Sequence, residues 1–273
     1  MKYVIFDRSI FHGEKFERIL ASPLLDLARK SRIRIYYTAQ FIEETLRYGL
    51  VPKNELSKQL EFLFDLNSIY WFAWPRHIVE AEFSGTYRNG IYYLKSDEEI
   101  MKSISGSYAL GSGELAKQEL STALALIEME WKGQNVVRDA RLRARLEVPK
   151  QNYDFDQYFE KNVEFFIEQV LMKEHLSSSE YLSRWQRNRG MLFFTEHYLK
   201  AVSSILLLPV RDHSLPVDTN DLWDATQLAH LGWADMMVSD DTKFMKSAFD
   251  LLFPGTRKAF LSLDQFLEFI RGL

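Results

Sequence analysis

The sequence predicts an α/β protein with a five-stranded parallel sheet, flanking helices and a mostly helical insertion. Short apolar runs alternate with helical patterns in residues 1–80, and the same alternation returns in residues 210–273. Helices that connect successive strands act as crossovers, and crossovers make the strands parallel. Between these two parts, residues 81–209 contain scattered glycines and long helical patterns, which predict an insertion that divides the core.

Three strands are expected in the first part of the core, because three short runs are rich in β-branched and aromatic residues. These runs are residues 3–6 (YVIF), 33–37 (IRIYY) and 69–74 (IYWFAW). Asp7 directly follows the first run. After the second run, Thr38 is suited to cap a helix whose first turns contain Glu43 and Glu44. Either glutamate is a candidate for a site shared with Asp7.

The stretch from residue 216 to 244 (PVDTNDLWDATQLAHLGWADMMVSDDTKF) is dense in acidic side chains. Its apolar residues recur at helical spacing as far as Gly232, so Asp221 and Asp224 share one face of the first turns of a helix. A short apolar run, ADMMV, then predicts a fourth strand. It is followed by the remaining two acids of the group, Asp240 and Asp241.

The end of the chain continues the alternation. We expect a helix over residues 242–252, a fifth strand near residues 258–261 (KAFL) and a last helix over residues 262–270. Within the insertion, apolar spacing predicts helices over residues 114–131, 155–173, 178–187 and 191–207.

Composition narrows the classes of function. The 273-residue chain has a formal net charge of −4, which argues against bulk attraction to nucleic acid but permits a local basic patch. It contains no cysteine, so disulfides and thiolate metal sites are excluded and a cytoplasmic location is expected. Asp7 and Arg8 interrupt the first apolar run too early for a signal peptide, and we expect no membrane partner. The motifs of phosphate-binding loops, dinucleotide folds, zinc proteases and serine hydrolases are missing from the sequence.

The acidic residues are expected to meet at one edge of the sheet. In the usual doubly wound order the first and fourth strands are neighbours, and ligands bind at the carboxyl ends of the strands. Neighbouring carboxylates repel one another and raise each other's pKa values, and Mg²⁺ or Mn²⁺ relieves this repulsion. Acidic metal cages of this kind typically serve phosphoester hydrolysis by activated water. Taken singly, the same acids also fit helix N-termini, turns or an exposed helical face.

Three segments, VIFDRS, FIEETL and NDLWDATQLAHLGWADMMVSDDTKF, resemble the PIN-domain family of metal-dependent ribonucleases, which includes the VapC toxins. The resemblance covers residues 1 to about 80 and 210–273. It implies a PIN-like, Rossmann-like sheet that binds Mg²⁺ or Mn²⁺ and hydrolyses RNA or another single-stranded nucleic acid. The family's acidic positions fall on Asp7, Glu44, Asp221 and Asp241, with Ser9 and Ser239 as supporting hydroxyls. Asp224 and Asp240 are expected either as further ligands or as groups that support the ligands.

The resemblance leaves several alternatives open. The long middle region departs from the compact toxins, so a toxin role is not carried over, while a protein inhibitor or regulator and a homo-oligomer remain compatible with it. A haloacid-dehalogenase-type phosphatase also begins with a strand ending in FD, but Ser9 stands where that chemistry needs a second aspartate. A non-catalytic PIN-like module that binds RNA or protein is the other alternative.

The insertion contains two basic stretches that are candidates for nucleic-acid contacts. Phosphates pair with lysine and arginine, and unpaired bases stack on aromatic rings or guanidinium groups. The candidate residues are Arg138, Arg141, Arg145, Arg184, Trp185 and Arg187. A solvated helix face is the simpler interpretation of both stretches.

Overall fold

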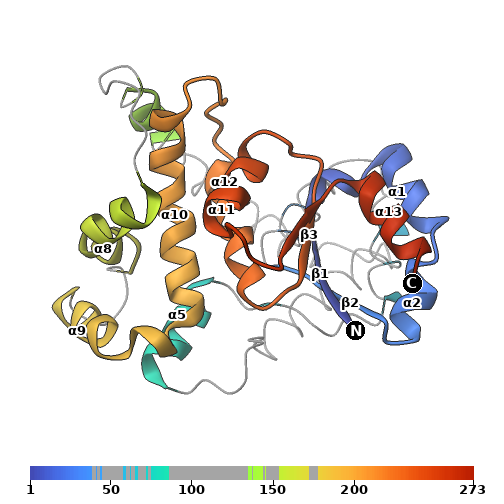
Figure 1. Ribbon diagram of the computed structural model, residues 1–273, viewed down its shortest axis with the longest axis horizontal. Coiled ribbons are helices and arrows are strands. Elements are labelled where there is room, and N and C mark those ends of the chain that lie inside the picture. The colour runs from blue at the N-terminus through green and yellow to red at the C-terminus, as the bar shows by residue number, and fades with distance from the viewer. Residues whose placement is uncertain are drawn as a thin grey trace, which may run out of the picture.

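The computed structural model (Figure 1) describes residues 1–38, 75–85, 154–171 and 178–273, together with scattered positions between residues 41 and 72 and between residues 135 and 145. The predicted helix over residues 114–131 and most of the predicted strand over residues 69–74 lie outside the described residues.

A four-stranded parallel sheet forms the centre of the described part of the chain, in the order β2-β1-β3-β4. The strands are β1 (Lys2–Phe6), β2 (Ile33–Tyr36), β3 (Met236–Val238) and β4 (Ala259–Leu261). The α/β class and the parallel pairing are therefore confirmed, and β1 lies beside β3 as the doubly wound order requires. The predicted count of five strands is not reached in this part of the chain. Of the expected third strand only Phe72 is described, and its backbone N–H donates to the Tyr37 carbonyl at 2.8 Å.

The two central strands are apolar on both faces because helices cover both faces of the sheet. Val4, Ile5 and Phe6 of β1 are fully buried. Side chains alternate along a strand, so Ile5 joins one hydrophobic cluster, while Val4 and Phe6 join the other.

One face of the sheet is covered by helices from the two ends of the chain. These helices are η1 (Arg8–Ile10), α1 (Gly13–Leu20), α2 (Leu24–Arg29) and α13 (Leu263–Arg271). In Figure 1 the blue α1 and the red α13 lie side by side, and Phe16 of α1 and Phe266 of α13 belong to the same cluster. Ser262 begins α13 with a capping box completed by Gln265.

The other face is covered by a larger helical layer. It consists of α5 (Pro75–Ser84), α8 (Phe155–Leu171), α9 (Ser178–Asn188), η3 (Arg189–Met191), α10 (Phe193–Arg211), α11 (Asp221–Ala229), η4 (His230–Gly232) and α12 (Phe244–Leu252). The predicted helices over residues 155–173, 178–187 and 191–207 correspond to α8, α9 and α10.

The long helix α10 joins the predicted insertion to the sheet-forming core. It packs against α8, α5, α11 and α12. Figure 1 shows α8 on one side of α10 and α11 and α12 on the other. The Glu82 carboxylate of α5 accepts hydrogen bonds from the backbone N–H groups of Phe194 (2.7 Å) and Thr195 (2.8 Å), which satisfies donors at the N-terminus of α10. Most of α10 falls in the range predicted as insertion, yet its buried side chains share one cluster with Ile5 and Met237 of the sheet.

Within the described part of the chain, no single helix is long and apolar enough to cross a membrane. The consecutive segments 179–191 and 193–211 reach the length and apolar composition of a membrane span only when they are taken together, and they are bent by 112° at their junction.

Candidate metal centre

Asp7 lies at the carboxyl end of β1, where the first and third strands of the sheet meet. Its backbone N–H donates to the Val238 carbonyl at 2.9 Å, which extends the β1–β3 pairing by one residue. Asp7 is 5% exposed, and its Oδ2 accepts hydrogen bonds from the hydroxyls of Ser9 and Ser239, the latter at 2.7 Å. Burial raises the pKa of Asp7, the two hydroxyls oppose this rise, and the nearby Asp241 adds to it.

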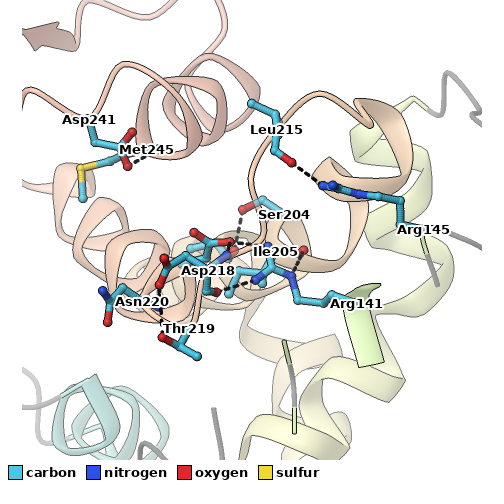
Figure 2. Close-up of polar contacts among 12 residues, drawn as sticks. Arg141, Arg145, Ser204, Ile205, Leu215, Asp218, Thr219, Asn220, Asp241 and Met245 are labelled. Carbon is cyan, nitrogen blue, oxygen red and sulfur yellow. Dashed lines mark hydrogen bonds and ion pairs between the residues drawn. The ribbon is translucent and has the colours of Figure 1, made fainter. Parts of the chain in front are cut away.

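Asp241 follows β3 in the turn that leads to α12. Its backbone N–H donates to Ser239 Oγ at 3.0 Å, so Ser239 bridges the two aspartates. The Asp241 carboxylate accepts from the backbone N–H groups of Lys243 (2.8 Å) and Met245 (3.2 Å), and Figure 2 shows this carboxylate beside Met245. The helix-capping role that the sequence left open for Asp241 is thus present, and each carboxylate oxygen has a further lone pair for another ligand.

Asp224 on α11 is the carboxylate on which the other acids converge. Its pKa is raised well above the usual value, first by burial and then by the negative charges of Asp7, Glu44, Asp241 and Asp221. No lysine or arginine of the described residues forms an ion pair with Asp224. The structure therefore brings five predicted acids into one electrostatic neighbourhood. Glu44 belongs to it, and the alternative residue Glu43 lies outside the described residues.

Asp221, the first residue of α11, has a cationic partner from the insertion. Arg141 Nη2 donates to Asp221 Oδ2 at 2.7 Å, and the two side chains are 2% and 3% exposed. The same oxygen accepts the backbone N–H of Asp218 at 3.0 Å. Burial raises the pKa of Asp221, and Arg141 works against that rise. Asp221 is therefore held in a buried ion pair at the margin of the acidic group.

Asp240 contacts a different part of the molecule from its neighbour Asp241. Its carboxylate pairs with Lys15 Nζ of α1 at 2.8 Å and accepts the backbone N–H of Leu263, at the start of α13, at 3.0 Å. Burial disfavours its charged form, but these contacts outweigh burial and lower the pKa of Asp240. The structure thus places Asp240 with α1 and α13.

The residues proposed for nucleic-acid contacts have mixed surroundings. Arg141 and Trp185 are each 3% exposed, and this burial does not fit the surface role that the sequence suggested for them. Arg145 donates to the Leu215 carbonyl (Figure 2) and Arg184 to the Phe83 carbonyl, so both guanidinium groups serve internal contacts. Arg138 and Arg187 lie in exposed contacts with Asp139 and Ser183. The basic spacing of the sequence therefore does not describe a continuous basic surface.

Arg141 is the residue of the site whose role the sequence did not indicate. Its guanidinium donates to three acceptors: Ile205 O at 2.9 Å, Asp218 O at 3.2 Å and Asp221 Oδ2. Figure 2 shows its side chain extending toward Ile205 and Asp218. In the sequence it was one cation of a basic run, and its acidic partner lies 80 positions away. The sequence contained no signal for this role. A buried arginine is rare unless it is paired with an acid, but the burial of Arg141 is known only from the fold.

No protein-family model, no curated protein and no solved structure matches this chain.

The donor set suits a hard divalent cation in its chemistry. Asp7, Asp224, Asp241 and Glu44 offer only carboxylate oxygens, which Mg²⁺ and Mn²⁺ prefer, and the repulsion at Asp224 is the kind that a cation relieves. In the present side-chain arrangement, no three acidic or histidine side chains of the described residues are grouped closely enough to hold a metal ion. Binding would therefore require the carboxylates to turn toward a common ion.

Proposed function

We propose that this protein is a metal-dependent endoribonuclease of PIN-like architecture that hydrolyses RNA phosphodiesters. The observation that carries the proposal is the gathering of acids at the carboxyl ends of β1 and β3. There Ser239 bridges Asp7 and Asp241, and the charges of Asp7, Glu44, Asp221 and Asp241 raise the pKa of Asp224. Carboxylates that are brought together from distant parts of the chain repel one another, and a bound cation relieves that repulsion. The proposed activity gives this arrangement a chemical purpose.

In the proposed reaction, the protein's own residues bind and orient. Asp7, Asp224, Asp241 and Glu44 would hold Mg²⁺ or Mn²⁺, which when bound activates water and stabilises charge on the phosphate. Ser9 and Ser239 fix the orientation of the Asp7 carboxylate through its Oδ2 atom. Such partners of a ligating group tune its position and its basicity. The backbone N–H groups of Lys243, just before α12, and of Met245, in its first turn, fix Asp241 in the same way.

A cleavage assay with matched aspartate variants tests the proposal. A fluorescently labelled single-stranded RNA should be cut in the presence of Mn²⁺ or Mg²⁺ and should stay intact after chelation with EDTA. Asp7→Asn and Asp224→Asn should each lower the rate by at least about 100-fold while circular dichroism remains that of the parent. Asp250→Asn is the control, because Asp250 is an exposed residue of α12 paired with Lys246. Equal cleavage by the parent and both site variants would rule out the assigned site.

Asp240→Asn and Asp241→Asn separate two adjacent acids of the same turn. Asp240 pairs with Lys15, whereas Asp241 lies near Asp7 and Asp224. We therefore expect Asp241→Asn to lose cleavage and Asp240→Asn to retain most of it. The reverse result would move the metal site toward α1 and α13.

A non-catalytic PIN-like binding module is the second candidate, and a specific observation favours it. Arg141 already neutralises Asp221, and the Asp241 carboxylate already caps α12. These contacts would stabilise the acidic group in a module that binds without hydrolysing RNA. For such a module we expect RNA binding in a filter or fluorescence-anisotropy assay, with no cleavage by the parent protein at millimolar Mn²⁺.

A further inference from the structure

The environment of Asp221 differs from that of the other acids in the proposed metal centre. Asp224 has no paired cation among the described residues, whereas Asp221 is bonded to Arg141 at 2.7 Å and to the backbone N–H of Asp218 at 3.0 Å. Both contacts use the same oxygen, Oδ2. A positive charge from the insertion therefore already occupies the Asp221 end of the acidic group.

Arg141 is firmly held in this place. Its Nε donates to Ile205 O of α10 and its Nη1 donates to Asp218 O, so three acceptors from two adjoining segments surround one guanidinium. The guanidinium carbon also lies over the ring of Phe244 of α12, 5.6 Å from the ring centroid, and this contact further limits the movement of Arg141. Arginine also cannot release its proton at accessible pH. A divalent cation that approached Asp221 would have to displace a fixed charge and break several buried hydrogen bonds.

Carboxylate-rich nuclease centres can hold either one or two divalent cations, and in the two-metal arrangement the ions lie about 3.5–4 Å apart and share neighbouring carboxylates. A second ion needs acids that the first ion does not saturate. In this chain Asp221 would be such an acid, because it precedes Asp224 by three residues and lies beside it on the same face of α11. Because Asp221 is already paired with Arg141, it is not available as a ligand for a second ion.

We propose that Arg141 takes the place at Asp221 that a second divalent cation would otherwise take, so that the centre binds one cation through Asp7, Glu44, Asp224 and Asp241. This inference rests on the proposed function, which it deepens. Asp221 is then a positioning residue that anchors the insertion to α11. The insertion thereby sets the metal stoichiometry of a site built from the two ends of the chain.

Manganese titration of the full chain tests this inference without relying on cleavage. Free Mn²⁺ is followed by electron paramagnetic resonance, and native mass spectrometry counts the bound ions. The parent should bind one Mn²⁺ per chain, and Asp221→Asn should also bind one, with less than about a threefold change in affinity. Arg141→Met should bind two. Arg138→Met is the matched control, because Arg138 pairs with Asp139 at the surface, and it should bind one.

A paired replacement keeps the test informative if Arg141→Met does not fold. Arg141→Met combined with Asp221→Leu removes both charges together, and we expect a folded protein that still binds one Mn²⁺. Loss of the ion in Asp221→Asn or in this double variant, with the parent binding one, overturns the inference and leaves the metal-dependent function standing. Two ions in the parent, or one in a folded Arg141→Met, also overturn it. A parent that binds none removes the proposed function together with the inference.

Discussion

Ser239 Oγ donates a hydrogen bond to Asp7 Oδ2 at 2.7 Å, although the two residues are 232 positions apart in the sequence. Ser239 is fully buried, and its oxygen also accepts the backbone N–H of Asp241 at 3.0 Å. One hydroxyl thus ties the ends of β1 and β3 together and orients the two aspartates that follow them.

Replacing Ser239 with alanine should destabilise the protein by about 1–3 kcal/mol, because a buried carboxylate and a backbone N–H each lose a partner. The loss of a hydrogen bond to the charged form should also raise the pKa of Asp7 further. Urea unfolding at pH 7 measures the first effect, and carboxyl chemical shifts in a pH titration measure the second. Ser214→Ala, in an exposed turn beside Asp212, is the control. Equal stability of the two variants would mean that the hydroxyl does not support Asp7.

Asp224 should make the metal-free protein less stable as the pH rises. Its pKa is raised on folding, so the folded state binds more protons than the unfolded state above the usual pKa of an aspartate, and stability falls with pH through that range. Asp224→Asn should therefore be more stable than the parent at pH 7, by an amount on the order of 1 kcal/mol. Thermal unfolding in EDTA at pH 4 and pH 7 measures the difference, with Asp250→Asn as the control.

Adding Mn²⁺ should make the parent more stable than Asp224→Asn, which reverses the order expected without metal. A cation that binds only the folded parent stabilises it in proportion to the logarithm of its concentration, whereas Asp224→Asn should gain little. If Mn²⁺ raises the melting temperature of both proteins equally, Asp224 is not part of the binding site.

Arg141→Met should cost about 3–5 kcal/mol in metal-free buffer, because it leaves the Asp221 carboxylate buried without its partner. The double variant Arg141→Met with Asp221→Leu should recover most of this loss, since replacement of a whole buried ion pair by apolar side chains is often neutral. Chemical denaturation of the parent, both single variants and the double variant gives the coupling energy. Arg138→Met should change stability by less than about 1 kcal/mol, because its pair with Asp139 is exposed. Additive losses in the cycle would show that the two charges are not coupled.

His230 should weaken the fold at acidic pH. It is fully buried between the rings of Phe72 and Phe194, at centroid distances of 4.5 Å and 5.0 Å, and neither ring nitrogen has a hydrogen-bond partner among the described residues. Burial lowers its pKa from 6.5 to about 3. Between pH 6.5 and pH 3, His230 is therefore protonated in the unfolded state and neutral in the folded state. The free energy of unfolding falls as the pH drops through that window.

His230→Phe should remove this dependence, since phenylalanine has no proton to bind and fits an aromatic stack. Between pH 7.5 and pH 5 the parent should lose up to about 2 kcal/mol more than the variant, at about 1.4 kcal/mol per pH unit below 6.5. Urea unfolding at both values checks the difference. His213→Phe is the comparison, because His213 lies exposed in the turn after α10. Parallel pH profiles of parent and His230→Phe would contradict the assignment.

Local patterns predicted the parallel strands because a strand covered on both faces must be apolar throughout. The runs YVIF, IRIYY, ADMMV and KAFL all contain strands of the sheet, within one or two residues of their expected limits. The described part of the chain has a four-stranded sheet, and the expected third strand lies mostly outside the described residues. Of its run, IYWFAW, only Phe72 is described, and the backbone N–H of Phe72 donates to the Tyr37 carbonyl.

Spacing within helices and turns was less informative about the directions of acidic side chains. Asp240 and Asp241 are adjacent in the sequence, yet one pairs with Lys15 of α1 and the other caps α12 beside Asp7. The difference depends on which helix packs on each side of the turn. A sequence pattern does not contain that information.

The sequence by itself determined the α/β class, the pairing of the first strand with the strand after α11, and the gathering of acids where those strands end. These features follow from alternation, crossover connections and apolar runs, which act over a few residues or through simple topology. Only the tertiary structure decided that Arg141 of the predicted insertion lies buried against Asp221 and that α10 is part of the central core. Burial and charge pairing between segments about 80 residues apart depend on how whole helices pack, and no local spacing specifies that packing.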